Sequence, residues 1–394
     1  MSLLALTETQ AEIQKLARDY AQRELVHLAG ERDRESRFDR AMVTQMAELG
    51  FFGMLTPEHY DGLGLDASSY LLALEEIAVA DASAAVLLSV HNSLPIQMIL
   101  NFGTEEQRTR FLPPMARGEL LGAFALSEPE AGSDAAALRC QAVRDGDDWV
   151  LTGTKAWVSH GNEAGVILCM ARTDTSADRR GTKGISTFIL TPDLPGFHLA
   201  KKESKMGLRA SPTLQINLDG CRVPADRLLG EEGKGLVYAL GSLDHGRLGI
   251  AAQAIGIARA ALEASARYAG ERQQFGKPIA DFQAIQFKIA DMATRITAAR
   301  VLVHAAANAK ERGEKITRFS SMAKVFASET AMWVTTQAIQ IFGGYGYVTD
   351  YPVERYFRDA KVTEIYEGTS EIQRIVIARE TLAAASAADG SIPD

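Results

Sequence analysis

The chain has 394 residues, of which 46% are hydrophobic and 23% are charged, a composition typical of a folded protein and too apolar for a disordered one. Fifty acidic residues against 42 basic ones give a net charge of −8, so no basic field is expected to attract nucleic acid. The length favours two or three domains with a sizeable core.

Cysteines, histidines and hydropathy argue against a disulfide framework, a structural metal and a membrane span. The three cysteines are odd in number and far apart, and no histidines recur at metal-ligand spacing. The most apolar stretch, 77–90, is shorter than the about 20 residues that cross a bilayer. The N-terminus lacks the basic region of a signal peptide. We therefore expect a reduced cytoplasmic protein without a metal, or a mitochondrial matrix protein if the chain is a processed eukaryotic form.

Residues 1 to about 120 show the pattern of a helical domain. Thr7 and Gln10 have the spacing of a capping box at the start of a first helix. Further helices are predicted over 70–79 and 94–102, and the pair Pro113-Pro114 is expected to end this block.

From about 121 to 230 the pattern changes to short β-branched runs that are separated by turn residues, for example Asp219-Gly220. No helix-length segment alternates with these runs, which disfavours a parallel doubly wound sheet. An antiparallel sandwich or barrel is predicted instead. The predicted strands cover 138–143, 149–153, 156–159, 166–173, 185–191 and 213–218.

Beyond residue 231 the pattern is that of long helices. Six apolar positions from Ile285 to Val303 follow alternating steps of four and three, which is typical of a left-handed bundle seam. Helices are predicted over 234–270, 281–312 and 317–341, with a last one from 371. The predicted fold class is α+β: a helical N-terminal domain (1–120), an antiparallel β domain (121–230) and a C-terminal four-helix bundle (231–394).

Two polar segments, 124–134 and 155–161, form the first candidate binding site. A Ser-Glu-Pro turn exposes backbone N–H groups at a sheet edge, and Trp157 offers a flat face for stacking a heterocycle. The alternative is a hairpin loop with a core tryptophan, which composition alone favours.

Three further patterns are ambiguous. Asp244 and Arg247 share a helix face, either as a surface ion pair, which is favoured when they are taken alone, or as a clamp for a ligand. Arg272 follows a helix end, where it could hold a pyrophosphate or serve as a C-cap. The glycine-rich turn at 340–346 lacks the spacing of a dinucleotide-binding fingerprint.

Glu367 lies just before a predicted helix start. Ser370 and Gln373 have capping-box spacing, which places Glu367 on a loop beside Gly368. Apolar neighbours there would raise the pKa of Glu367 and make it a base near neutral pH. The alternative is a glutamate that only stabilises the helix dipole.

Six motifs in order give the chain its resemblance to a known family. They are Leu-Ser-Glu-Pro…Gly-Ser-Asp, Lys-Ala-Trp-Val-Ser, Leu-Asp-x-Gly-Arg, Glu-Arg-x-x-Phe-Gly, Gln-Ile-x-Gly-Gly-x-Gly-Tyr and Ile-Tyr-Glu-Gly-Thr-Ser-Glu-Ile-Gln-Arg. With them the sequence resembles the acyl-CoA dehydrogenase family, and within it most of all the short-chain, butyryl-CoA type. The resemblance covers nearly the whole chain.

The resemblance implies FAD as cofactor, an acyl-CoA substrate, an electron-transferring flavoprotein as electron acceptor, and a homotetramer built as a dimer of dimers. The implied flavin-binding residues within a subunit are Phe124, Leu126, Ser127, Trp157, Val158 and Ser159, with Thr369 and Glu371 completing the site. The residues implied to reach the FAD of a neighbouring subunit are Arg272, Gln274, Phe275, Gln283, Gln340, Ile341, Phe342, Gly343 and Gly344. The implied substrate-binding residues are Ser133, Asp244, Arg247 and Gly368, with Leu87 and Val90 towards the base of the acyl tunnel.

The resemblance also implies the chemistry. Glu367 would take the α-proton while the β-hydrogen leaves as hydride to flavin N5, giving trans-2-enoyl-CoA. Gly246 stands where some relatives carry the base instead, so this chain has no competing carboxylate there. The alternatives are a branched short-chain substrate (isobutyryl- or 2-methylbutyryl-CoA), a carrier-protein thioester, an oxygen-using oxidase or monooxygenase, and a catalytically silent FAD-binding protein.

Overall fold

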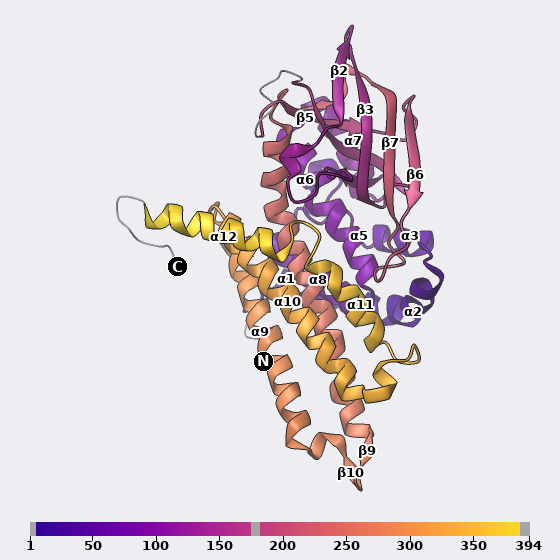
Figure 1. Cartoon of the computed structure of the whole chain (residues 1–394), viewed down its shortest axis with the longest axis vertical. Coiled ribbons are helices and arrows are strands. Elements are labelled where there is room, and N and C mark those ends of the chain that lie inside the picture. Colours follow the sequence, from indigo (N-terminus) through magenta and orange to yellow (C-terminus); the bar gives the residue numbers. More distant parts are fainter. Residues whose placement is uncertain (1–4, 175–181, 387–394) are drawn as a thin grey trace.

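The computed structural model describes residues 5–174 and 182–386, which form three consecutive blocks (Figure 1). Helices form the first block, a sheet the second and longer helices the third, which confirms the predicted architecture. The N-terminal helices are α1 (Glu8–Tyr20), α2 (Val26–Glu35), α3 (Arg40–Glu48), α4 (Ala67–Ala80), α5 (Ala82–Ser93), α6 (Pro95–Phe102) and α7 (Glu105–Ala116).

Two local predictions at the ends of these helices have opposite outcomes. The capping box at Thr7 and Gln10 is present, with both reciprocal hydrogen bonds. Pro113 and Pro114, however, do not end the block before its last helical turn: they lie inside α7, which continues to Ala116. Their carbonyl oxygens accept hydrogen bonds from backbone N–H groups beyond the helix. The last turn of the helix is therefore hydrogen-bonded although the prolines themselves contribute no N–H donor.

Helices α4 and α5 are interior helices, since every residue of both is buried. Each begins at an aspartate, Asp66 or Asp81, whose carboxylate accepts hydrogen bonds from the first turn. The stretch Ala82–Phe102 is long and apolar enough to cross a bilayer, but 94% of an 18-residue apolar segment within it is buried inside the fold. The apolar stretch is therefore longer than the segment 77–90 that was considered from the sequence. Its high hydropathy is explained by burial in the protein core.

His91 connects α5 to the sheet. The backbone N–H of Gly122 donates to His91 Nδ1 at 2.9 Å, so the proton lies on Nε2, which donates to the carbonyl of Met115 at 3.1 Å. Burial lowers the pKa of His91 to about 4. The neutral imidazole is therefore a structural bridge between α5, α7 and β1.

Replacing His91 with Gln is expected to flatten the acid dependence of stability. The ordinary histidine pKa is 6.5, so as the pH falls below it the unfolded chain takes up a proton that the folded His91 refuses. At pH 5 this difference destabilises the wild type by about 2 kcal/mol. In urea unfolding, the loss of unfolding free energy between pH 7 and pH 5 should shrink by about that amount in the variant. An equal loss in both proteins would contradict this assignment.

The middle block is a mostly antiparallel sheet, as predicted, with strand order β6-β7-β3-β2-β4-β5-β8. Strands β1, β6 and β8 were not predicted, and neither was the parallel pairing of β4 with β1 and, at one residue pair, with β2. The runs predicted over 149–153 and 156–159 join into one strand, β3. The strands are β1 (Leu121–Ala125), β2 (Gln141–Asp145), β3 (Asp148–Ser159), β4 (Ala164–Arg172), β5 (Ile185–Leu190), β6 (Phe197–Lys202), β7 (Thr213–Val223) and β8 (Leu228–Leu229).

The predicted turn at Asp219-Gly220 is wrong. Both residues lie inside β7, and the pairing with β3 skips there: Leu151 pairs with Cys221, and Gly153 pairs with Leu218. Gly220 has a φ of 59°, a conformation that glycine adopts without strain. The Asp-Gly pair therefore forms a β-bulge that bends a continuous strand.

The C-terminal block contains α8 (Gly235–Glu271), α9 (Gln283–Glu311), α10 (Thr317–Phe342), α11 (Val353–Thr363) and α12 (Ser370–Ala385). Two short strands, β9 (Gln273–Gln274) and β10 (Lys277–Pro278), form a hairpin between α8 and α9. Helices α8 to α11 pack into a bundle, while α12 packs on α10 and points away from it (Figure 1).

Helix α11 was not predicted, and the predicted last helix, α12, is an addition to the bundle. The apolar residues of α11 (Val353, Tyr356, Phe357 and Ala360) follow the i, i+3, i+4, i+7 spacing of a helix, so the signal was present although two of its four buried residues, Asp359 and Thr363, are polar. The predicted seam on α9 is buried from Met292 to Val303, while its first positions, Ile285 and Ile289, are only partly buried.

Candidate active site

Glu367 lies on the loop between α11 and α12, as predicted. Glu367 and Gly368 both have positive φ angles, 53° and 92°. This backbone conformation is uncommon for a residue with a side chain and is often found at functional sites. Both carboxylate oxygens of Glu367 are buried, and neither has a hydrogen-bond partner among the described residues. Such a buried, unpaired acid is costly to a fold, which marks it as a functional group.

Burial raises the pKa of Glu367 to about 7, and the nearby cations Lys324 and Arg247 oppose this shift. At neutral pH the carboxyl group can therefore both accept and release a proton. No hydrogen bond competes for its lone pairs within the described chain. The site has the properties of a general base.

The Glu367 carboxylate packs directly against Gly246 of α8. A Cβ atom at Gly246 would lie 2.0 Å from Glu367 Oε2. One turn further along, a Cβ at Gly249 would lie 2.5 Å from Ser89 Oγ and 3.1 Å from the Tyr70 hydroxyl. Two helix glycines thus allow a carboxylate and two hydroxyl groups to pack closely against α8.

Sequence analysis missed Tyr70, Ser89 and Gly249. Both hydroxyls are buried without a hydrogen-bond partner among the described residues. The available signal was a pair of glycines three residues apart inside a long helix, where each destabilises the helix relative to alanine. Nothing in the sequence indicated which residues of α4 and α5 would face that pair.

Asp244 and Arg247 form an ion pair at 2.6 Å, but it is buried, so the surface-pair interpretation is wrong. Thr317 Oγ1 donates to Asp244 at 2.7 Å, and Arg247 also contacts Ser321 Oγ at 3.4 Å. Burial raises the pKa of Asp244. The pair fixes the guanidinium of Arg247 close enough to Glu367 to favour its ionised form.

The predicted capping box at Ser370 and Gln373 is wrong. Thr369 caps α12, since its Oγ1 accepts a hydrogen bond from the backbone N–H of Ile372 at 3.3 Å. Ser370 is the first helical residue, and Gln373 points back to the loop. Two adjacent hydroxyl residues gave equally good caps in sequence, and the loop geometry selected the first. Glu371 is exposed in the first turn.

The segments 124–134 and 155–161 lie together, as expected. Lys155 is fully buried and donates to Glu128 Oε1 at 2.7 Å and to the carbonyl of Leu126 at 3.2 Å. The backbone N–H of Ala156 donates to the carbonyl of Ser127 at 2.9 Å. An internal ion pair therefore holds the two segments edge to edge.

Trp157 is 61% exposed and has a φ of 61°, so the core-tryptophan alternative is wrong. Its neighbour Val158 is buried, while Ser159 and Phe124 are partly buried. Ser133 is exposed on the adjoining loop. An exposed indole held by a strained backbone is available to stack on a planar ligand.

The other residues that the resemblance implies for the cofactor lie elsewhere in the same chain. Arg272 follows Arg247 by 25 positions along α8, which at about 1.5 Å per residue is roughly 37 Å. Around that end, Tyr268 stacks on Phe342 at 4.1 Å and Arg272 lies over Tyr345 at 5.4 Å. The structure thus groups Arg272, Gln274, Phe275, Gln283, Gln340, Ile341, Phe342, Gly343 and Gly344 at the far end of the bundle.

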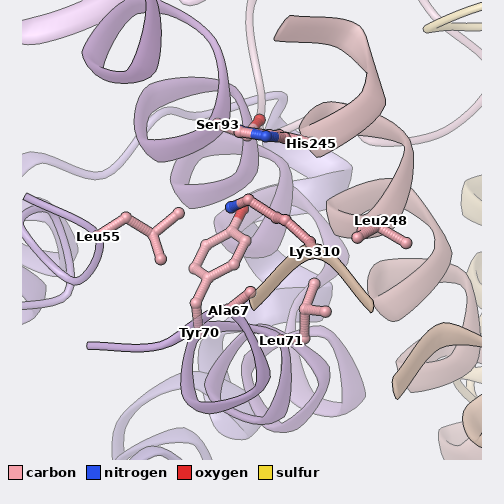
Figure 2. Close-up of a pocket in the computed structure, with 8 residues that line it drawn as sticks. All are labelled: Leu55, Ala67, Tyr70, Leu71, Ser93, His245, Leu248 and Lys310. Carbon is pink, nitrogen blue, oxygen red and sulfur yellow. The ribbon is translucent and has the colours of Figure 1, made fainter. Parts of the chain in front are cut away.

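Leu87 and Val90 are buried in the N-terminal core. Ser89, between them on α5, is the residue that packs against Gly249. Behind the ring of Tyr70 is a cavity of about 10 Å³, which has room for about one water molecule. Figure 2 shows Tyr70 and Lys310 pointing into it. This cavity is too small for an acyl group.

Comparisons with known proteins agree along the whole chain. Three family models match in order: Acyl-CoA dehydrogenase, N-terminal domain (residues 7–119), middle domain (123–221) and C-terminal domain (233–382). The mouse (Mus musculus) mitochondrial short-chain specific acyl-CoA dehydrogenase is 49% identical over 377 residues, which is 96% of this chain and 91% of that protein.

Two solved structures are similar throughout. Butyryl-CoA dehydrogenase from Megasphaera elsdenii has a TM-score of 0.94 at 45% identity, covering 96% of this chain and 99% of the other. A chain from a structure described as the electron transferring flavoprotein of Acidaminococcus fermentans has a TM-score of 0.93 at 48% identity, with the same coverage.

Proposed function

This chain belongs to the acyl-CoA dehydrogenase family, and from that premise we propose that it oxidises a short-chain acyl-CoA thioester to trans-2-enoyl-CoA, with FAD as hydride acceptor. Members of the family are oxidoreductases acting on CH–CH groups. The observation that carries the proposal is the buried carboxylate of Glu367, which has no hydrogen-bond partner among the described residues and packs against Gly246.

Glu367 is proposed to remove the α-proton of the thioester. With a pKa of about 7, a large fraction of this group is ionised at neutral pH. Taking up the proton also removes a buried charge, so burial itself favours proton transfer from the substrate. Arg247 and Lys324 keep enough of the group ionised to react.

The residues around Trp157 fit a flavin. The exposed indole of Trp157 and the neighbouring hydroxyls of Ser127 and Ser159 offer a stacking face and polar contacts.

At the far end of the bundle, Gly343 and Gly344 form an open turn, where an added Cβ would meet nothing within 4 Å. When bound, FAD supplies the acceptor for the β-hydrogen as a hydride.

We propose that the distant cofactor residues complete the flavin site of a neighbouring subunit in a homotetramer. They lie too far from Arg247 to share a site with it in one chain. Phe275, Phe287 and Tyr347 are 93%, 64% and 87% exposed, and exposed aromatic residues of this kind are typical of protein interfaces. A groove of alanine, threonine, valine and leucine side chains also runs along α9 between residues 293 and 305.

A short acyl group fits the side chains on α8. Beyond Gly249, Gln253 is fully buried, donates to the carbonyl of Ala82 at 2.8 Å and accepts a hydrogen bond from the Tyr366 hydroxyl. Gly249 and Gln253 are four residues apart, about 6 Å along the helix. We propose that this bridged glutamine limits the acyl group to a few carbon atoms beyond Gly249.

The substrate proposal is tested by kcat/KM over acyl-CoA thioesters of increasing chain length. We expect the highest value for butyryl- or hexanoyl-CoA, because longer chains must displace the Gln253–Tyr366 hydrogen bond. A maximum with C8–C12 thioesters would contradict the short-chain assignment, and a maximum with isobutyryl- or 2-methylbutyryl-CoA would favour a branched substrate. Rapid reoxidation of the substrate-reduced enzyme by oxygen would favour an oxidase.

We further propose an electron-transferring flavoprotein as the physiological electron acceptor. The similar chain from the electron transferring flavoprotein structure of Acidaminococcus fermentans supports this choice.

A further inference from the structure

Two side chains hold the backbone of the Glu367 loop. The carbonyl oxygen of Gly368 accepts hydrogen bonds from Lys324 Nζ at 2.7 Å and from Gln373 Nε2 at 2.9 Å. Gln373 Nε2 also donates to the carbonyl of Glu367 at 3.0 Å. Two consecutive residues with positive φ are therefore fixed through their carbonyls, and this fixes the direction of the Glu367 side chain.

Lys324 is exceptional because a lysine is rarely buried completely. It comes from the middle of α10, and none of its surface is exposed. Its ammonium group donates a hydrogen bond to the carbonyl of Gly368. A buried charge is stabilised by a nearby opposite charge, and the carboxylate of Glu367 acts on Lys324 through its charge.

The charges around Lys324 and Glu367 belong to several elements. Lys324 faces Glu367 and Glu364 on the loop, Glu371 on α12 and Arg247 on α8. Burial lowers the pKa of Lys324 to about 8, and the Glu367 carboxylate opposes the shift.

Glu367 itself faces Lys324 from α10 and Arg247 from α8. Tyr70 on α4 and the adjacent Tyr366 also interact with its charge. Burial raises the pKa of both tyrosines, which keeps them neutral near pH 7. The two cations are thus the groups that favour the ionised form of Glu367.

We propose that Lys324 is a positioning residue for the dehydrogenation: its ammonium group holds the Gly368 carbonyl and keeps Glu367 ionised and packed against Gly246. The proposal rests on the role of Glu367 as the base. Gln373 also donates hydrogen bonds to this backbone but carries no charge. Comparing the two residues therefore separates the hydrogen bond of Lys324 from the effect of its charge on Glu367.

The test compares Lys324→Met, Lys324→Arg and Gln373→Leu in the FAD-loaded enzyme, with the rate of flavin reduction by butyryl-CoA measured from pH 5.5 to 9.5. For Lys324→Met we expect kcat at pH 7 to fall roughly tenfold or more, with KM changing much less. The acid limb of the profile should move up by about one pH unit, because loss of a neighbouring cation raises the pKa of Glu367. Lys324→Arg should keep the limb near the wild-type position, and Gln373→Leu should lower kcat without moving it.

Lys361→Met is the matched control. Lys361 pairs with Glu364 at 2.6 Å, but its side chain is 47% exposed. This variant therefore removes a cation beside the same loop without changing the buried surroundings of Glu367. Its profile should match that of the wild type. If Lys324→Met does not fold, Lys324→Gln replaces it, with the same expected shift.

A second readout does not depend on turnover. The infrared band of the protonated Glu367 carboxyl, identified by its loss in Glu367→Gln, is titrated in the substrate-free protein. A higher midpoint in the Lys324 variant supports the proposal even if butyryl-CoA is not the substrate. An unchanged midpoint together with an unchanged acid limb would overturn it. A wild type that reduces no flavin with any acyl-CoA would overturn the proposed function instead, and with it the base role that the Lys324 proposal rests on.

Discussion

Glu367→Gln is expected to slow flavin reduction by butyryl-CoA at least 10²–10⁴-fold, the usual contribution of a general base. The amide has nearly the same shape as the carboxyl group but cannot accept the α-proton. Both Glu367 oxygens are buried without hydrogen bonds among the described residues, so no hydrogen bond is lost. The variant does remove the charge interaction with Lys324 and Arg247. The measurement is stopped-flow reduction of the bound flavin under anaerobic conditions.

The same variant is expected to be more stable than the wild type at neutral and higher pH. The pKa of Glu367 is raised from 4.5 to about 7 in the folded protein, so the unfolded chain loses this proton at lower pH than the folded chain does. The wild type therefore loses stability as the pH rises from 4.5 through 7, by roughly 3 kcal/mol in total. Glu367→Gln lacks this term, and urea unfolding at pH 5 and pH 8 measures the difference.

Glu364→Gln is the control for both effects. Glu364 lies at the start of the same loop and pairs with the half-exposed Lys361. Its replacement should leave the rate within a few-fold and the pH dependence of stability unchanged. Equal losses of activity in the Glu364 and Glu367 variants would point to disruption of the loop and not to a missing base.

Gly246→Ala is expected to lower kcat roughly 100-fold although it adds a single methyl group. The new Cβ would lie 2.0 Å from Glu367 Oε2, so the carboxylate must move by an ångström or more. A misplacement of that size costs catalysis about two orders of magnitude. Steady-state kinetics and the affinity for a substrate analogue distinguish a displaced base from a blocked site.

Gly241→Ala is the matched control on the same helix. A Cβ there would meet nothing within 4 Å, and alanine favours a helix interior over glycine by about 1 kcal/mol. We expect wild-type kinetics and a slightly higher Tm. Full activity in Gly246→Ala would contradict the geometry assigned to the base.

Much of the fold followed from the sequence because its signals are local. Helical and β periods are set by neighbouring residues, and so are the capping box at Thr7 and the loop position of Glu367. Two local predictions failed because the sequence suited two local structures equally well. Thr369 and Ser370 both offer a capping hydroxyl, and Asp219-Gly220 suits a hairpin turn as well as a bulge.

The site could be predicted only in part, because it combines residues from distant segments. The motif residues Glu367 and Arg247 were visible in sequence. Tyr70 and Ser89 were not, since their hydroxyls meet the α8 glycines only through packing of α4 and α5 on α8. The sequence also did not reveal which side chains are buried. The Asp244–Arg247 pair lies inside the fold, whereas Trp157 is exposed.

The most direct test of the account is an anaerobic titration of the purified, FAD-reconstituted protein with butyryl-CoA, followed by the visible absorption of oxidised flavin. We expect the band to bleach at stoichiometric substrate and trans-2-enoyl-CoA to appear in equal amount. A flavin that stays oxidised with butyryl-CoA and with longer and branched thioesters, or a protein that binds no FAD, would contradict the proposed dehydrogenation.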